Sequence, residues 1–241
     1  MPARNYAKWK QVPGELKPGE YVDSRIYSDP EIFKKEISSI FKKVWIPVCH
    51  ESELPEVYNF RTSTIANIPV MVHRGQDGKV TAYANTYERR PRGTYEDTPQ
   101  QPTLKCEVVL GGFVWVTLNE DGPTVEEWVD GAFDCMRESL DSEPLDIFHY
   151  HKAIIPCNFK LWHDTNSEFY HDYLHYHNRI TGFNDSYFKR ENKCFNNGHV
   201  NVGSFEVQYD QYEGFESREE LSFPHLPINH WEMIDMFPGI N

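Results

Sequence analysis

The chain has 241 residues, a formal net charge of −13, 39% hydrophobic residues and 15% aromatic residues. This length provides for one large or two small domains, and the aromatic content argues against a disordered chain. The negative charge disfavours nucleic acid as a partner, no run of about 18 apolar residues predicts a transmembrane helix, and the N-terminus lacks the apolar segment of a signal peptide.

Residues 1–43 are expected to form an arm followed by a helix, because Asp29 and Pro30 stand in the order of an N-cap and a first helical residue. Residues 44–122 contain short apolar runs separated by turn residues such as Asp77-Gly78 and Gly111-Gly112. This pattern predicts a small antiparallel β-domain. Its expected strands are residues 44–49, 60–66, 69–73, 80–84, 106–110 and 113–118, with a polar loop over 86–105.

Residues 123–241 are expected to mix helices with strands, which makes the whole chain an α+β protein. Helices are predicted over 123–140, where Pro123 supplies the start, and over 165–177; strands are predicted over 146–156 and 200–209. The five cysteines are scattered, without a CxxC or CxH pair. This odd count favours a reducing cytoplasm as the location.

Four of the 11 histidines, His163, His171, His175 and His177, fall within 20 residues, with acidic residues among them. On a helix, His171 and His175 share one face, and Glu168 lies on the same face three residues earlier. Two histidines with one carboxylate form the facial triad of non-heme Fe(II) sites, which leaves positions open for O2 and substrate.

Two other interpretations of this segment stay open. The first is a polar helix whose histidines are hydrated or satisfied within the core. The second is a zinc hydrolase, since His171-Asp-Tyr-Leu-His175 imitates the HExxH of zinc peptidases with Asp172 in place of the catalytic glutamate. No third zinc ligand follows at a familiar spacing.

Two stretches carry a family resemblance. The first includes Asp29-Pro-Glu-Ile-Phe33, Trp45, His50-Glu-Ser-Glu-Leu-Pro55 and Asn85; the second is Asn158-Phe-Lys160 followed by Glu168-Phe-Tyr-His171 and His175. Gly112-Phe-Val-Trp-Val-Thr-Leu118 and Met236-Phe-Pro238 are weaker landmarks in the same order. In these residues the chain resembles the large (α) subunit of Rieske-type aromatic-ring-hydroxylating oxygenases.

The resemblance implies a Rieske-like β-domain over 44–122 and a partial helix-grip-like catalytic domain over 123–241. It implies that His171 and His175 bind a mononuclear Fe(II), and that Glu168 is the bridging carboxylate that couples this iron to a neighbouring subunit's cluster. The spacing is one residue shorter than the commonest family pattern, so His177 is an alternative to His175.

The chain departs from the family in its cluster loops. The family holds a [2Fe–2S] cluster with a CxH and a later CxxH. Tyr87 and Arg89 stand where the first pair would be, and residues 91–105 contain neither cysteine nor histidine. Because arginine stays protonated and cannot replace a neutral histidine, we expect no [2Fe–2S] cluster in this chain.

The second departure is downstream of Phe237-Pro238, where the family's third iron ligand, a carboxylate, would follow. Asp235 or Glu232 is a substitute that nothing in the sequence requires. We therefore expect either an incomplete chain or another polypeptide that covers the surface left open.

These departures favour a subunit of a hetero-oligomeric oxygenase. It would work with a complete α-like partner and, indirectly, a reductase or ferredoxin, to hydroxylate an aromatic or other hydrophobic substrate, and it would not be active alone. The alternative is a non-catalytic structural or regulatory subunit; the zinc hydrolase is a remote third interpretation.

Overall fold

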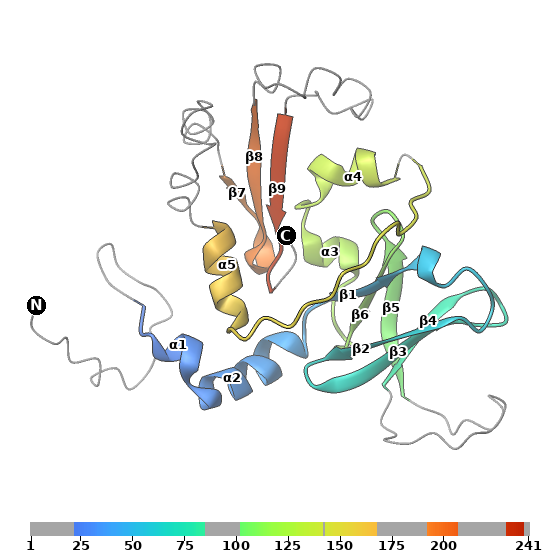
Figure 1. Cartoon of the computed structure of the whole chain (residues 1–241), viewed down its shortest axis with the longest axis horizontal. Coiled ribbons are helices and arrows are strands. Elements are labelled where there is room, and N and C mark those ends of the chain that lie inside the picture. The colour runs from blue at the N-terminus through green and yellow to red at the C-terminus, as the bar shows by residue number, and fades with distance from the viewer. Residues whose placement is uncertain (1–21, 85–101, 142, 168–191, 207–229, 239–241) are drawn as a thin grey trace, which may run out of the picture.

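The computed structural model describes residues 22–84, 102–141, 143–167, 192–206 and 230–238, which form two antiparallel sheets with helices beside and between them (Figure 1). This mixed α and β architecture confirms the expected fold class. None of the helices in these ranges is long and apolar enough to cross a membrane.

The first described elements are two short helices, α1 (Arg25–Ser28) and α2 (Pro30–Glu36). Helix α2 continues into one π-helical turn over Ile37–Phe41. The carboxylate of Asp29 accepts a hydrogen bond from the backbone N–H of Glu31 at 2.8 Å, and Pro30 is the first helical residue. The predicted N-cap is therefore confirmed.

A six-stranded antiparallel sheet follows, in the spatial order β1-β6-β5-β4-β3-β2. Its strands are β1 (Ile46–His50), β2 (Phe60–Ile65), β3 (Ile68–Arg74), β4 (Val80–Ala84), β5 (Thr103–Val109) and β6 (Phe113–Thr117). The turns at Asp77-Gly78 and Gly111-Gly112 join β3 to β4 and β5 to β6, as the sequence predicts.

Gly112 has a specific packing reason to be glycine. A Cβ at this position would lie 2.7 Å from Nε2 of His50. That nitrogen donates to the Gly111 carbonyl at 2.6 Å, while Nδ1 of the same ring lies 2.9 Å from Oγ of Ser52. His50 therefore fastens the end of β1 to the β5–β6 turn.

The expected helix over 123–140 is wrong as a single element, because the structure divides it into α3 (Val125–Val129) and α4 (Asp134–Asp141). Thr124 starts α3 with a capping box to Glu127. Asp130 and Gly131 then adopt positive φ values of 50° and 80°, a left-handed conformation that ends the helix.

The prediction of a strand over 146–156 is also wrong. Residues 144–155 are not assigned to a strand, since no described residues form a ladder with them. The backbone N–H of Ile147 instead donates to Oγ of Ser52 at 3.0 Å. Phe148 and Ile154 are 101% and 92% exposed, so this segment places large apolar side chains in water.

The second sheet has the order β7-β8-β9, formed by β7 (Asn192–Cys194), β8 (Val200–Glu206) and β9 (His230–Asp235). A buried cluster joins both sheets: Trp115 from β6, Trp45 just before β1, Trp128 from α3, Ile234 from β9, and Met236 just after β9. The carbonyl of Trp128 accepts hydrogen bonds from Asn197 Nδ2 at 2.9 Å and His199 Nε2 at 3.0 Å. Polar and apolar contacts together fix the second sheet against α3.

Candidate functional site

Helix α5 (Phe159–Ser167) leads directly into the segment that carries the predicted iron ligands. Asn158 precedes it, and its side-chain oxygen accepts a hydrogen bond from the backbone N–H of Lys160 at 3.1 Å. This is the geometry of an N-cap. The first residue of the Asn158-Phe-Lys160 stretch therefore starts the helix.

Lys160 forms a largely buried ion pair with Glu36 at the end of α2. Nζ of Lys160 lies 2.7 Å from Oε1 of Glu36, and the two side chains are 17% and 12% exposed. Beside this pair, the Phe159 and Phe41 rings meet edge to face with centroids 4.8 Å apart. The two stretches that carry the family resemblance are thus in direct contact in the fold.

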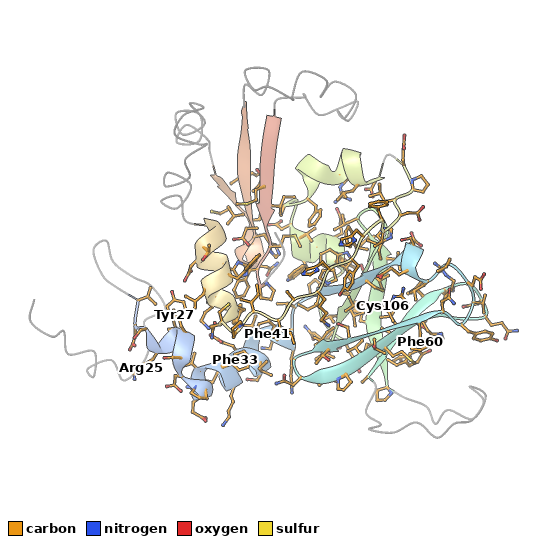
Figure 2. All side chains as sticks on the ribbon, in the orientation of Figure 1. Arg25, Tyr27, Phe33, Phe41, Phe60 and Cys106 are labelled. Carbon is orange, nitrogen blue, oxygen red and sulfur yellow. The ribbon has the colours of Figure 1, made fainter. Side chains whose placement is uncertain are left out.

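Tyr27 of α1 provides another link to α5, because its hydroxyl donates to Oδ2 of Asp164 at 2.5 Å. Burial and this hydrogen bond raise the pKa of Tyr27 to about 12, so the phenol keeps its proton at neutral pH. A groove of about 520 Å³ lies between the N-terminal helices and the start of α5, and its lining includes Tyr27, Phe33 and Phe41, which are labelled in Figure 2.

On the side of α5 that packs against β9, Nδ1 of His163 lies 2.9 Å from Oδ1 of Asp235, with the two side chains 13% and 8% exposed. The His163 ring also packs on Phe237, at a centroid distance of 5.5 Å. Phe237 precedes Pro238 through a cis peptide bond. The structure thus shows Asp235 in contact with His163, and its place as a possible third iron ligand stays an expectation.

Glu168, His171, His175 and His177 lie outside the described residues, as do Tyr87 and Arg89 of the cluster loop. Within the ranges that the structure describes, no group of three or more histidine, cysteine, aspartate or glutamate side chains is arranged to hold a metal ion. The predicted ligands therefore stay predictions. The structure does describe the helix that precedes them, because Ser167, the last residue of α5, immediately precedes Glu168.

Sequence reasoning missed the pairs that hold α5. His163 was grouped with the histidine cluster, whereas the structure pairs it with Asp235. The partners of His163 and Lys160 come from β9 and α2, far away in the sequence, and no local spacing signals such contacts.

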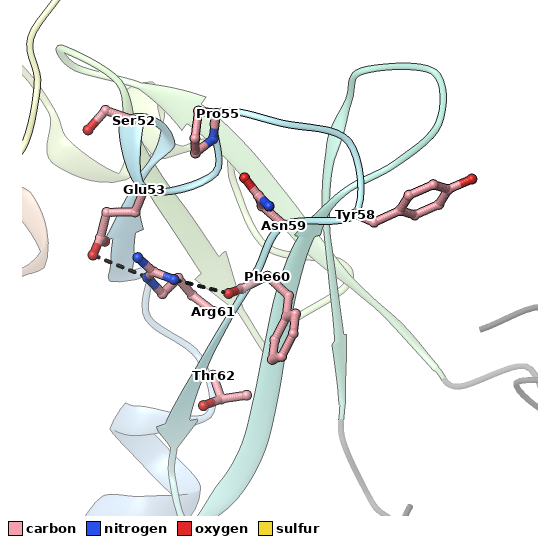
Figure 3. A pocket seen from close by; sticks show the side chains of 8 residues that line it. All are labelled: Ser52, Glu53, Pro55, Tyr58, Asn59, Phe60, Arg61 and Thr62. Carbon is pink, nitrogen blue, oxygen red and sulfur yellow. Dashed lines mark hydrogen bonds and ion pairs between the residues drawn. The ribbon is translucent and has the colours of Figure 1, made fainter. Parts of the chain in front are cut away.

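A second hollow, of about 720 Å³, lies on edge strand β2 rather than at α5 (Figure 3). Arg61 crosses it, 3.3 Å from Oε1 of Glu53, and Tyr58 beside it has an unusual φ of 70°. Its lining residues are Ser52, Glu53, Pro55, Tyr58, Asn59, Phe60, Arg61 and Thr62. None of these residues belongs to α5 or to the histidine segment, so we give this hollow no part in the candidate site.

Among curated proteins, the chain is 49% identical over 290 aligned residues to the methanesulfonate monooxygenase hydroxylase subunit alpha of Methylosulfonomonas methylovora, covering 100% of this chain and 70% of the relative. It is 30% identical to the 2-aminobenzenesulfonate 2,3-dioxygenase subunit alpha of an Alcaligenes species, covering 95% of this chain and 68% of that one. The first alignment is longer than the 241 residues of the chain, so the relative has internal residues that this chain lacks. No family model matches the chain.

Among solved structures, the quaternary ammonium Rieske monooxygenase CntA in complex with an inhibitor matches with a TM-score of 0.64 at 18% identity, covering 90% of this chain and 65% of CntA. Naphthalene 1,2-dioxygenase with indole in its active site matches with a TM-score of 0.56 at 16% identity, covering 79% of this chain and 54% of that enzyme. These structural matches concern the fold alone. They agree with the mixed, antiparallel architecture described above.

Proposed function

The chain belongs to the α-subunit family of Rieske-type oxygenases, and from this we propose that it is a subunit of a hetero-oligomeric oxygenase that works with a complete α-like partner. The observation that carries the proposal is the 49% identity to a monooxygenase α subunit across the whole chain. The buried Lys160–Glu36 pair supports it, because it ties the two stretches with the family pattern into one structure.

In this proposal His171 and His175, with His177 as the alternative to His175, hold a mononuclear Fe(II). When bound there, the iron supplies the activation of O2. Glu168 is proposed as the carboxylate that faces the partner subunit and couples the two chains. The contribution of α5 is positional: capped by Asn158 and held by Lys160, it fixes where the ligand segment begins.

The cluster that feeds electrons to this iron is proposed to belong to the partner. Rieske-type oxygenases use a [2Fe–2S] cluster together with non-heme iron, and they receive electrons through a reductase or ferredoxin. Residues 85–105 of this chain lack the cysteine and histidine pairs that would hold such a cluster. Turnover would therefore require both chains.

For the substrate, the names of the relatives favour one chemical class. Two relatives that match almost the whole chain are named for methanesulfonate and 2-aminobenzenesulfonate. We therefore propose an organic sulfonate, which is an anion, as the candidate substrate ahead of the aromatic or other hydrophobic substrate expected from the sequence.

The deciding experiment measures iron per chain by elemental analysis in the wild type and in His171→Ala, after anaerobic loading with Fe(II). We expect the substitution to remove most of the bound iron. His73→Ala is the matched control, because His73 lies on β3 and bonds Thr81. Iron unchanged by His171→Ala would overturn the active-site version. His175→Ala and His177→Ala, compared in the same assay, identify the second ligand.

The partner is tested separately by co-expression with a complete α-like chain that carries CxH and CxxH. A stable complex whose O2 consumption depends on an organic sulfonate supports the full proposal. A complex in which this chain binds no iron supports the alternative, a structural or regulatory subunit. Zinc recovered at one ion per chain would instead favour the hydrolase.

A further inference from the structure

Residues 144–155 connect α4 to α5 without regular secondary structure, as the yellow trace between these helices in Figure 1. Every residue of the segment is exposed, and it joins neither of the two sheets that the described residues form. Both of its ends are nevertheless held. The backbone N–H of Ile147 donates to Oγ of Ser52 at 3.0 Å, and Phe159, shortly after the segment, packs on Phe41.

The exposed side chains of this segment include several that are large and apolar. Phe148, Tyr150, Ile154 and Ile155 are 101%, 68%, 92% and 54% exposed. A gathering of apolar side chains on a protein surface marks an interaction site. Backbone groups outside a ladder can in addition pair with a strand from another chain, which supplies main-chain hydrogen bonds.

We propose that residues 147–155 pair antiparallel with the same residues of a second copy of this chain. The order of apolar residues is similar in both directions from His151. Pairing across a two-fold axis at that residue sets Phe148 opposite Ile154 and Ile147 opposite Ile155. Apolar side chains therefore meet apolar side chains at both ends of the ladder.

Charge also favours a second copy at this surface. Asp146 and Lys152 are the only charged residues in 144–155 at neutral pH, so the segment has no net charge within a chain of −13. Two copies therefore meet here without the repulsion that their overall charge produces. In the proposed register Lys152 lies opposite Tyr150, whose ring attracts a cation.

The area is sufficient for a weak dimer. A buried aromatic side chain removes about 150–250 Å² from water, so Phe148 and Tyr150 of two copies provide up to about 1,000 Å². Ile154 and Ile155 bring the total close to the value of about 1,200 Å² at which stable interfaces begin. The dimer is therefore expected to be reversible. It requires neither iron nor the proposed α-like partner, so its test is independent of the proposed function.

Disulfide trapping in the full chain tests the register. Cys135, Cys157 and Cys194 are first replaced by serine, so that these thiols do not compete. His151→Cys then sets two cysteines directly opposite each other, with Cα atoms about 4.5–5.5 Å apart, a separation that a disulfide spans. His149→Cys is the matched control, because residue 149 lies opposite Ala153 and about 13 Å along the strand from its own copy.

Mild oxidation should convert most of the His151→Cys chain into a disulfide-linked dimer and leave the His149→Cys chain monomeric. Equal cross-linking of the two variants would overturn the proposal, because it would show contact without the proposed register.

Sedimentation velocity measures the association in the wild-type chain, in about 1 M NaCl, where a screening length of about 3 Å suppresses the repulsion between two acidic chains. The wild type should form a dimer as its concentration rises. Phe148→Glu with Ile154→Glu sets carboxylates opposite each other and should stay monomeric. Phe60→Glu is the control, because Phe60 is 46% exposed on β2, and it should leave the dimer intact.

A wild-type chain that is monomeric at every concentration would overturn the proposal. A dimer lost in Phe60→Glu but kept in the double variant would assign the contact to β2 instead. Protection of residues 144–155 from hydrogen exchange only after an α-like chain is added would assign the segment to that partner, and it would equally overturn pairing with a second copy.

Discussion

Lys160 and Glu36 are 124 residues apart in the sequence, yet their charged groups meet at 2.7 Å beneath the start of α5. The contact connects the N-terminal helices to the helix that leads into the predicted iron ligands. Because both side chains are largely shielded, neither charge is well hydrated, and each depends on the other.

Lys160→Met should therefore destabilise the chain by about 3 kcal/mol, because it leaves the Glu36 carboxylate buried without its partner. Denaturant unfolding measures this loss. Lys34→Met is the matched control: Lys34 pairs with Glu31 at 2.6 Å, but the side chains are 71% and 72% exposed, and the expected loss is below about 0.5 kcal/mol. Adding Glu36→Gln to Lys160→Met should recover more than half of the stability. Equal losses in Lys160→Met and Lys34→Met would contradict the ion pair's role.

His199 should make the chain less stable in acid. Its ring is fully buried between the second sheet and Trp128, and burial lowers its pKa below 6.5. A histidine kept neutral by folding contributes stability above the unfolded pKa, and this contribution is lost as the pH falls below it. Thermal unfolding of His199→Gln should show a flatter decline in the melting temperature between about pH 7 and pH 5 than the wild type. An identical slope in the two proteins would refute the assignment.

Four of the five thiols, those whose side chains the structure describes, should divide into two reactivity classes. Burial raises the pKa of the Cys49 thiol and of the Cys106 thiol to about 12, whereas Cys157 and Cys194 are exposed. Because only the thiolate reacts, iodoacetamide near about pH 8 should label Cys157 and Cys194 and should reach Cys49 and Cys106 only after denaturation. Peptide mapping of the alkylated chain distinguishes the classes. Rapid labelling of Cys106 in the folded chain would show that its strand opens readily.

Reconstitution tests the expected absence of a cluster. Anaerobic incubation with iron and sulfide should leave acid-labile sulfide at background, because residues 85–105 contain no cysteine or histidine. Tyr87→Cys with Arg89→His restores only one ligand pair, so this double variant should also stay at background. Stoichiometric sulfide in the wild-type chain would show that other ligands hold a cluster.

The first sheet was predictable because its signals are local. Asp77-Gly78 and Gly111-Gly112 specify turns between neighbouring strands, and Asp29-Pro30 specifies a helix start. The break after α3 was missed because apolar residues continue at helical spacing beyond it. The Asp130-Gly131 pair, which takes the left-handed conformation, was the available signal.

The long-range contacts that hold α5 in place could not be predicted in the same way. Glu36, His163 and Asp235 are charged or titratable residues in separate segments, and only the folded chain shows which of them meet. The proposed assignment of the iron ligands depends on the sequence pattern and on the family, because the segment with His171 and His175 lies outside the described residues. The structure therefore describes how the helix before the ligands is held.

Phe148 and Ile154, almost fully in water, affect how the stability of this chain should be understood. Moving two such side chains out of water contributes about 3–6 kcal/mol, which is comparable with the net stability of many domains. Any protein that covers residues 144–155 would stabilise the folded chain by mass action. The melting temperature would then depend on the concentration of that protein as well as on the chain's own residues.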